Sequence, residues 1–229
     1  MDFPILSSLI LLPIVGALFI LISKSSDTYK FKSSKYVALF VSFVNFFISI
    51  YLWYIFDPNS TEFQFVENRL WLKGFVNYKI GIDGISILFI ILSTFIAPLC
   101  IVSVNRTIKV RLKDFLIAIL VMESLMIGVF CSLDLVIFYL FFEGGLIPMF
   151  LIIGIWGGSR RVYSAFKFFL FTLLGSVLML VAIISIYWIS GTTDVAELYK
   201  LGIEPKYQNL LWLAFFSSFA VKTPMWPVH

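Results

Sequence analysis

Charged residues, cysteine and histidine are all scarce in this chain, and each scarcity excludes a class of protein. Only 13% of the 229 residues are charged and 61% are hydrophobic, whereas about a quarter of the residues of a soluble domain are charged. The mean hydropathy is +1.01. A soluble fold could not cover so much apolar surface, so we expect a single transmembrane domain over residues 1–229 that contacts a lipid bilayer.

The chain offers no set of residues suited to a metal, a cofactor or a nucleophile. Its two cysteines, Cys100 and Cys131, lie in or at the end of apolar segments, where packed thiols are expected. We find no phosphate-binding glycine loop, no paired-cysteine metal motif and no Ser/His/Asp set. The net charge of +4 sits in short clusters between apolar runs, so it predicts membrane topology rather than nucleic-acid binding.

Seven apolar runs approach the roughly 20 residues that a helix needs to cross a bilayer. They are Phe3–Ile22, Tyr36–Phe56, Ile82–Val104, Phe115–Phe130, Leu135–Trp156, Tyr163–Ser190 and Asn209–Val221. The fold class predicted is an all-α, polytopic transmembrane bundle of about seven helices. The first run lacks a basic segment before it and a cleavage site after it, so we expect it to remain as a helix.

The basic residues predict the orientation of this bundle. The first, third and fifth connections carry most of the Lys and Arg, and the others carry most of the acidic residues. By the positive-inside rule, the N-terminus then faces outward. The longest connection, Asp57–Gly81, mixes aromatic residues with charges and is expected to be an ordered interfacial segment at the outer surface.

Three charged residues lie inside the apolar runs: Glu123, Glu143 and Lys222. Each costs at least about 2.5–3.5 kcal/mol at the bilayer centre, so it must pair or serve a function. For Glu123, in the fourth run, two interpretations stay open: a place in a proton path, or a protonated carboxyl group bonded to a neighbouring helix.

Glu143 precedes two glycines and Pro148. Proline donates no backbone hydrogen bond, so the carbonyl of Gly144 is freed beside the carboxyl group, and the glycines let the helix bend. Such a spot admits water and suits proton transfer. The alternative is a glutamate that only locks two helices together.

Lys222 precedes Pro224 and Pro227, which should end the seventh helix just after the lysine and make that helix discontinuous. Free carbonyls at the helix end favour a cation, whereas apolar surroundings favour a neutral amine. A lysine between these influences is suited to loading and releasing a proton. The alternative is a lysine that snorkels to water at the membrane edge.

Four segments together resemble one known family. They are residues 141–149 (FFEGGLIPM), 154–158 (GIWGG), 167–176 (KFFLFTLLGS) and 222–229 (KTPMWPVH). They are similar to chain M (chain 4), the antiporter-like subunit of proton-translocating NADH:quinone oxidoreductase, respiratory complex I. The resemblance implies that Glu143 is the fifth-helix glutamate, Lys222 the broken-helix lysine, Glu123 the fourth-helix acid and His229 a polar residue near the channel axis.

The resemblance also implies the context of the chain. This subunit binds no redox cofactor, while NADH, quinone, FMN and iron-sulfur clusters belong to the wider complex, whose other membrane subunits are the partners. The chain corresponds to the N-terminal part of such a subunit, with N-terminal helices in residues 1–110 and the first part of an inverted repeat in residues 111–229. The expected location is a bacterial inner membrane or a mitochondrial one.

Two other functions stay open. The motifs taken singly also fit a subunit of a multisubunit sodium/proton antiporter. A truncated, non-conducting membrane remnant is the third hypothesis.

Overall fold

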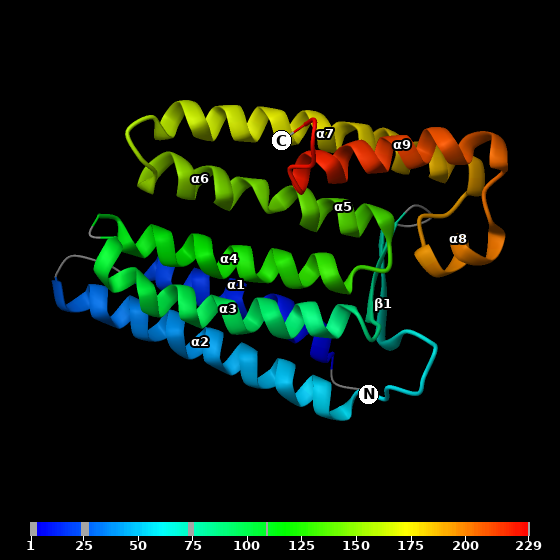
Figure 1. The fold of residues 1–229 in the computed structure, drawn as a ribbon. Coiled ribbons are helices and arrows are strands. Elements are labelled where there is room, and N and C mark those ends of the chain that lie inside the picture. The colour runs from blue at the N-terminus through cyan, green and yellow to red at the C-terminus, as the bar shows by residue number, and fades with distance from the viewer. Residues whose placement is uncertain (1–3, 24–27, 73–75, 109, 229) are drawn as a thin grey trace. The chain divides into compact units, whose positions relative to one another are not determined.

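The computed structural model describes residues 4–23, 28–72, 76–108 and 110–228. Within these ranges the chain is mostly helical with one two-stranded sheet, and it divides into two compact units (Figure 1). The first unit comprises Met1–Glu67 and Ile80–Cys131, and the second comprises Asn68–Lys79 and Ser132–His229. The predicted all-α class is confirmed, and the structure adds the sheet to it.

Four long helices form the first unit: α1 (Ile5–Ile22), α2 (Thr28–Ile55), α3 (Ser86–Thr107) and α4 (Leu112–Cys131). Helix α4 packs against the other three, and α2 also packs against α1 and α3. Their shared core consists of small and aliphatic side chains, namely Ala17, Ile20, Ala38, Ile101, Leu116 and Leu120. Lipid tails are as apolar as these side chains, so close packing rather than exclusion of water holds such helices together.

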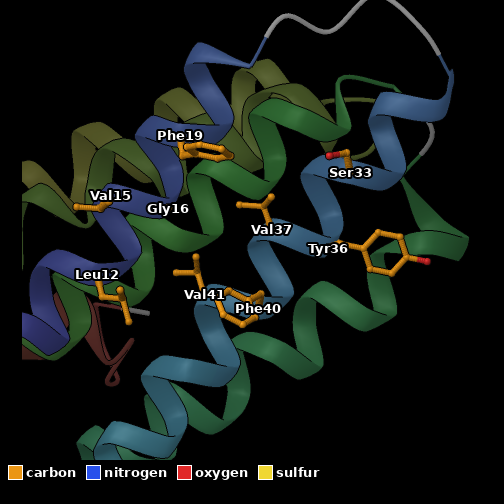
Figure 2. Close-up of a pocket in the computed structure, with 9 residues that line it drawn as sticks. All are labelled: Leu12, Val15, Gly16, Phe19, Ser33, Tyr36, Val37, Phe40 and Val41. Carbon is orange, nitrogen blue, oxygen red and sulfur yellow. The ribbon is translucent and has the colours of Figure 1, made fainter.

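Helices α1 and α2 approach each other closely at Gly16. A Cβ atom on this glycine would lie 2.8 Å from Cγ1 of Val41, so the crossing has room for hydrogen only. An open groove of about 720 Å³ lies beside the crossing, and Figure 2 shows Phe19 of α1 and Phe40 of α2 at its walls. The residues that line this groove carry no charge, so it takes no part in the site described below.

The segment Asp57–Gly81 contains two strands, β1 (Gln64–Leu72) and β2 (Val76–Ile82), which pair in a two-stranded sheet. The strands were not predicted, and residues 73–75 of this segment lie outside the described residues. Aromatic and β-branched residues favour strands, and the charged residues between them concealed the pattern. That the sheet faces the outer surface stays a prediction.

Charged side chains from other segments form hydrogen bonds with free backbone groups at both ends of α1. Glu67 on β1 accepts a hydrogen bond of 2.9 Å from the backbone N–H of Leu6 at the start of the helix. At the other end, the ammonium group of Lys113 donates to the carbonyl oxygens of Leu21 and Ser23 at 2.9 and 2.8 Å. An anion at the N-terminus and a cation at the C-terminus both stabilise a helix, because each interacts favourably with the helix dipole.

The second unit contains α5 (Leu135–Gly144), α6 (Leu146–Trp156), α7 (Arg161–Ser190), α8 (Val195–Leu201) and α9 (Pro205–Lys222). Helix α7 packs against α5, α6 and α9. It ends at Gly191, whose positive φ of 74° gives the left-handed conformation that closes many helices. The short α8 was not predicted, although Asp194 caps it by accepting hydrogen bonds from two backbone N–H groups.

Six helical segments among the described residues are long and apolar enough to cross a membrane, which confirms six of the seven predicted spans. They are Ile5–Ile22, Ser33–Ile55, Ser86–Val104, Leu112–Cys131, Leu135–Trp156 and Arg161–Ser190. The seventh run does form a helix, α9, but it is not among these segments. Its first turns carry Lys206, Gln208 and Asn209, which lower its hydropathy.

Candidate functional site

Glu143 lies where the fifth predicted helix is interrupted. Helix α5 ends at Gly144, Gly145 is a single non-helical residue, and α6 starts at Leu146. The N–H of Gly145 still bonds to the carbonyl of Phe141 at 3.3 Å, so the interruption is a local distortion rather than a separate loop. Pro148 has no N–H to offer to the carbonyl four residues earlier, which is the physical cause that the sequence predicted.

The carboxyl group of Glu143 is unusual among the described side chains. Both of its oxygens, Oε1 and Oε2, are buried, and neither has a hydrogen-bond partner in the part of the chain that the structure describes. Buried polar atoms are paired in the great majority of cases, so an unpaired carboxyl group requires an explanation. Water, a proton or a cation would satisfy it.

Lys222 is the last residue of α9, as predicted from the two prolines that follow it. Its Nζ atom donates a hydrogen bond of 3.0 Å to the carbonyl oxygen of Phe142. The same Nζ atom lies 3.9 Å from the centroid of the Phe142 ring, within the range of a cation–π interaction. The fold therefore holds the lysine against the residue that precedes Glu143.

The lysine and the glutamate do not form a direct ion pair. Among the described residues, ion pairs within 4.0 Å join Lys79 to Asp194 and Arg111 to Asp114. Lys222 remains exposed at its position in α9. Glu143 and Lys222 are thus close in the fold, but Lys222 bonds to the Phe142 carbonyl and Glu143 has no hydrogen-bond partner among the described residues. In this arrangement the charge of one group influences the other without locking it.

A glycine on α7 allows α9 to pack closely against that helix. A Cβ atom on Gly175 would lie 3.0 Å from Cβ and 3.1 Å from Cγ1 and Cγ2 of Val221, the residue before Lys222. Contacts of this length are shorter than the optimal carbon separation of about 3.5–4.0 Å. The absence of a side chain at this position therefore permits the close packing of α7 and α9 that places Lys222.

Glu123 belongs to the first unit and has direct partners there. It is 4% exposed. Asn45 Nδ2 donates to its Oε1 at 2.8 Å, and Ser42 Oγ donates to its Oε2 at 3.3 Å. This geometry fits both predicted interpretations of Glu123, because a bonded carboxyl group can also exchange a proton. His229 lies outside the described residues.

Sequence reasoning missed several polar partners of these residues. Asn45 and Ser42 are one example, and Tyr139 is another. Tyr139 lies one helical turn before Glu143, and its hydroxyl group lies near Ser176 on α7. The spacing of four residues between Tyr139 and Glu143 was the available signal, because such residues share one helix face.

A polar junction at the start of α5 was also missed. Asp134 is 2% exposed and accepts hydrogen bonds from the N–H groups of Val136 and Ile137 and, at 2.6 Å, from the hydroxyl of Thr193. A backbone bridge joins Asp134 to Asp194, and Asp194 pairs with Lys79 on β2. The junction fixes the first turn of the helix that carries Glu143.

No group of three His, Cys, Asp or Glu side chains among the described residues is arranged to hold a metal ion. In the second unit, a buried acid with no hydrogen-bond partner among the described residues and a nearby lysine can accept and release protons. In the first unit, Glu123 is a separate acid bonded by an amide.

Known membrane proteins resemble this chain in sequence. Residues 132–229 match the family model described as "NADH:quinone oxidoreductase/Mrp antiporter, TM". The chain is 52% identical to NADH-quinone oxidoreductase subunit M of Rhodobacter capsulatus, over 98% of this chain and 46% of that protein. It is 46% identical to NADH-ubiquinone oxidoreductase chain 4 of Marchantia polymorpha, over 98% of this chain and 45% of that protein.

Solved structures agree with the sequence comparisons. A chain of the respiratory complex I from Thermus thermophilus with bound NADH superposes with a TM-score of 0.85 at 29% identity, over 98% of this chain and 45% of that chain. A chain of an archaeal membrane-bound sulfane sulfur reductase gives a TM-score of 0.79 at 21% identity, over 100% of this chain and 35% of that chain, and so shares the fold. The predicted resemblance to chain M (chain 4) is confirmed, and the chain spans about half the length of the curated relatives it matches.

Proposed function

We propose that this chain is part of a proton-translocating membrane subunit of NADH:quinone oxidoreductase, respiratory complex I, and that Glu143 and Lys222 carry its proton-transfer step. The observation that supports this proposal most is the contact between Lys222 Nζ and the Phe142 carbonyl, next to a glutamate whose two buried oxygens have no partner among the described residues. A purely structural glutamate would be expected to hold a partner.

In this proposal the charge on Glu143 sets the proton occupancy of Lys222. An ionised carboxylate nearby favours the ammonium form, which the Phe142 carbonyl and ring also stabilise. When Glu143 takes a proton or another cation, that attraction is lost and Lys222 releases its proton. No covalent chemistry is required, and the energy comes from quinone reduction elsewhere in the complex.

The other predicted residues have supporting roles. Glu123 is a second acid on the proton path, and His229 is a polar residue near the channel axis. The chain binds no redox cofactor itself, and NADH, quinone, FMN and the iron-sulfur clusters lie in other subunits. Its partners are the other membrane subunits and the lipid bilayer.

The proposed location is a bacterial inner membrane, with the mitochondrial inner membrane as the alternative, since both bacterial and plant relatives match. The N-terminus faces outward and the basic connections face the cytoplasm or matrix. The single transmembrane domain, with N-terminal helices in residues 1–110 and part of a repeat in residues 111–229, also stays a proposal.

The matched family description also names the Mrp antiporter, so a sodium/proton antiporter subunit is the second candidate. Proton transport that requires sodium and proceeds without NADH oxidation would favour it. A chain that assembles into the complex and conducts no ions would favour the third hypothesis, a non-conducting remnant.

Glu143→Gln tests the proposal in membranes where the complete polypeptide is assembled in its complex. Glutamine keeps the shape and hydrogen-bonding ability of glutamate but carries no charge. We expect NADH-driven proton pumping to fall by at least about tenfold, the effect of a lost interaction of about 1.4 kcal/mol, while assembly is unchanged. The control is Glu62→Gln, at an exposed acid. Normal pumping in Glu143→Gln would make the glutamate a structural residue.

A further inference from the structure

A row of three polar side chains on α2 faces the interior of the first unit. Ser42, Asn45 and Ser49 are spaced three and four residues apart, which places them on one helix face. Each has no exposed surface at all, although α2 also carries many exposed aromatic residues. The polar face of this helix is therefore turned into the unit and away from lipid.

The row makes contacts at both of its ends. At one end, Ser42 Oγ donates to Glu123 at 3.3 Å, and Asn45 Nδ2 in the middle of the row donates to the same carboxyl group at 2.8 Å. At the other end, the hydroxyl oxygens of Ser49 and Thr94 on α3 lie 2.7 Å apart, and Thr94 is also fully buried. The contacts of Asn45 and Ser49 are one helical turn apart along α2.

The amide oxygen of Asn45 takes part in none of these contacts. Asn45 Oδ1 is buried and has no hydrogen-bond partner among the described residues. Such atoms in folded proteins are commonly satisfied by a buried water, which needs two to four polar partners. Ser49, one helical turn after Asn45, and Thr94 on the facing helix carry hydroxyls that also bond to carbonyls of their own helices. Their oxygens can still accept a hydrogen bond from such a water.

We propose that Asn45, Ser49 and Thr94 bind a water molecule beside Glu123, and that this water is the proton-transfer partner of Glu123 within the first unit. The inference rests on the proposed function. In this arrangement Asn45 Nδ2 donates to the carboxyl group and Asn45 Oδ1 accepts a hydrogen bond from the water. The carboxyl O–H bond of Glu123 breaks as a new O–H bond forms on the water, and the reverse transfer returns a proton to the carboxylate.

In this arrangement Asn45 is a positioning residue, because it orients both the acid and the water and takes no proton itself. The alternative is that the polar row only joins helices, as interhelical hydrogen bonds commonly do in membranes. Two experiments separate these roles.

The first experiment looks for the water directly. A structure of the complete polypeptide in its complex, at a resolution that shows ordered water, should have density within 3.5 Å of Asn45 Oδ1 and of the Thr94 or Ser49 hydroxyl. The limit of 3.5 Å is the outer reach of a hydrogen bond. A dry site would overturn the proposal.

The second experiment tests the role of the Thr94 hydroxyl group. Thr94→Val has the shape of threonine without its hydroxyl, and we expect pumping about fivefold slower in fully assembled complex. Thr94→Ser restores the hydroxyl and should restore the rate. The control is Ser93→Ala, since the Ser93 hydroxyl bonds only to the Phe89 carbonyl of its own helix among the described residues.

Each outcome decides between the two roles. Normal pumping in Thr94→Val would overturn the proton role, and so would equal defects in Thr94→Val and Thr94→Ser, because packing would then explain both. If Thr94→Val prevents assembly, the rate in Thr94→Ser and the density at Asn45 decide. Glu143→Gln reports on the proposed function separately, since it lies in the other unit.

Discussion

Gly175→Ala tests whether close packing of α7 and α9 positions Lys222. The new Cβ atom would meet three side-chain carbons of Val221 at 3.0–3.1 Å. Val221 is β-branched and has one preferred rotamer in a helix, so it cannot turn away, and α9 must move. Overpacking of this kind costs about 1–3 kcal/mol. Alanine also gains up to about 1 kcal/mol of helix propensity over glycine, which opposes that cost.

Gly154→Ala is the matched control, because it gains the same propensity without the clash. A Cβ atom on Gly154 would lie 3.5 Å from Cβ of Ala165, an ordinary contact. We therefore expect Gly175→Ala to be less stable than Gly154→Ala by about 1–3 kcal/mol. Thermal unfolding in detergent measures this difference, and proton pumping should fall in Gly175→Ala alone, since Lys222 moves with α9. Equal stability and equal pumping in the two variants would show that close packing at Gly175 does not position Lys222.

Three further predictions concern the connections. A cysteine at position 110, in a cysteine-free background, should resist an impermeant reagent added outside intact cells, and rapid labelling would reverse the orientation. Asp194→Asn removes the ion pair with Lys79 and should lower the free energy of unfolding by about 1–3 kcal/mol; an unchanged melting temperature would show that the junction is dispensable. Burial raises the pKa of Asp83, but hydrogen bonds from Ser86 and from backbone N–H groups outweigh it and hold that pKa below its ordinary value. A lowered folded-state pKa stabilises the fold above the ordinary value, and this contribution is lost as pH falls through the folded value. Asp83→Asn should flatten the acid dependence of the melting temperature, and an unchanged acid profile would count against the assignment.

The transmembrane helices were predictable because length and apolarity determine them locally. Six predicted runs reappear as helices with ends shifted by a few residues. The interruption at Gly145 and the end of α9 at Lys222 were also predictable, since proline removes a backbone donor wherever it stands. These features depend on a few consecutive residues and on no distant partner.

The partners of the charged residues could not be predicted in the same way. Asn45 lies 78 residues from Glu123, and Phe142 lies 80 residues from Lys222. A sequence shows that a buried charge needs a partner, but several serines, asparagines and carbonyls satisfy that need equally well. Helix packing selects among them, and small residues such as Gly175 and Gly16 determine that packing through distances a single sequence does not reveal.

The second unit illustrates how local and distant signals differ. The cap of α8 at Asp194 follows from a motif within four residues, whereas the pairing of Asp194 with Lys79 joins segments 115 residues apart. The two strands were missed for a related reason, because a strand is stabilised mainly by its neighbour.

A double-mutant cycle measures whether Glu143 and Lys222 act as one unit. Proton pumping linked to NADH oxidation is measured for Glu143→Gln, Lys222→Ala and the double variant, each in fully assembled complex. Groups that act together are strongly non-additive. We expect Lys222→Ala to add little to the loss of proton pumping in Glu143→Gln. If the double variant is instead slowed by the product of the two single effects, Glu143 and Lys222 act independently.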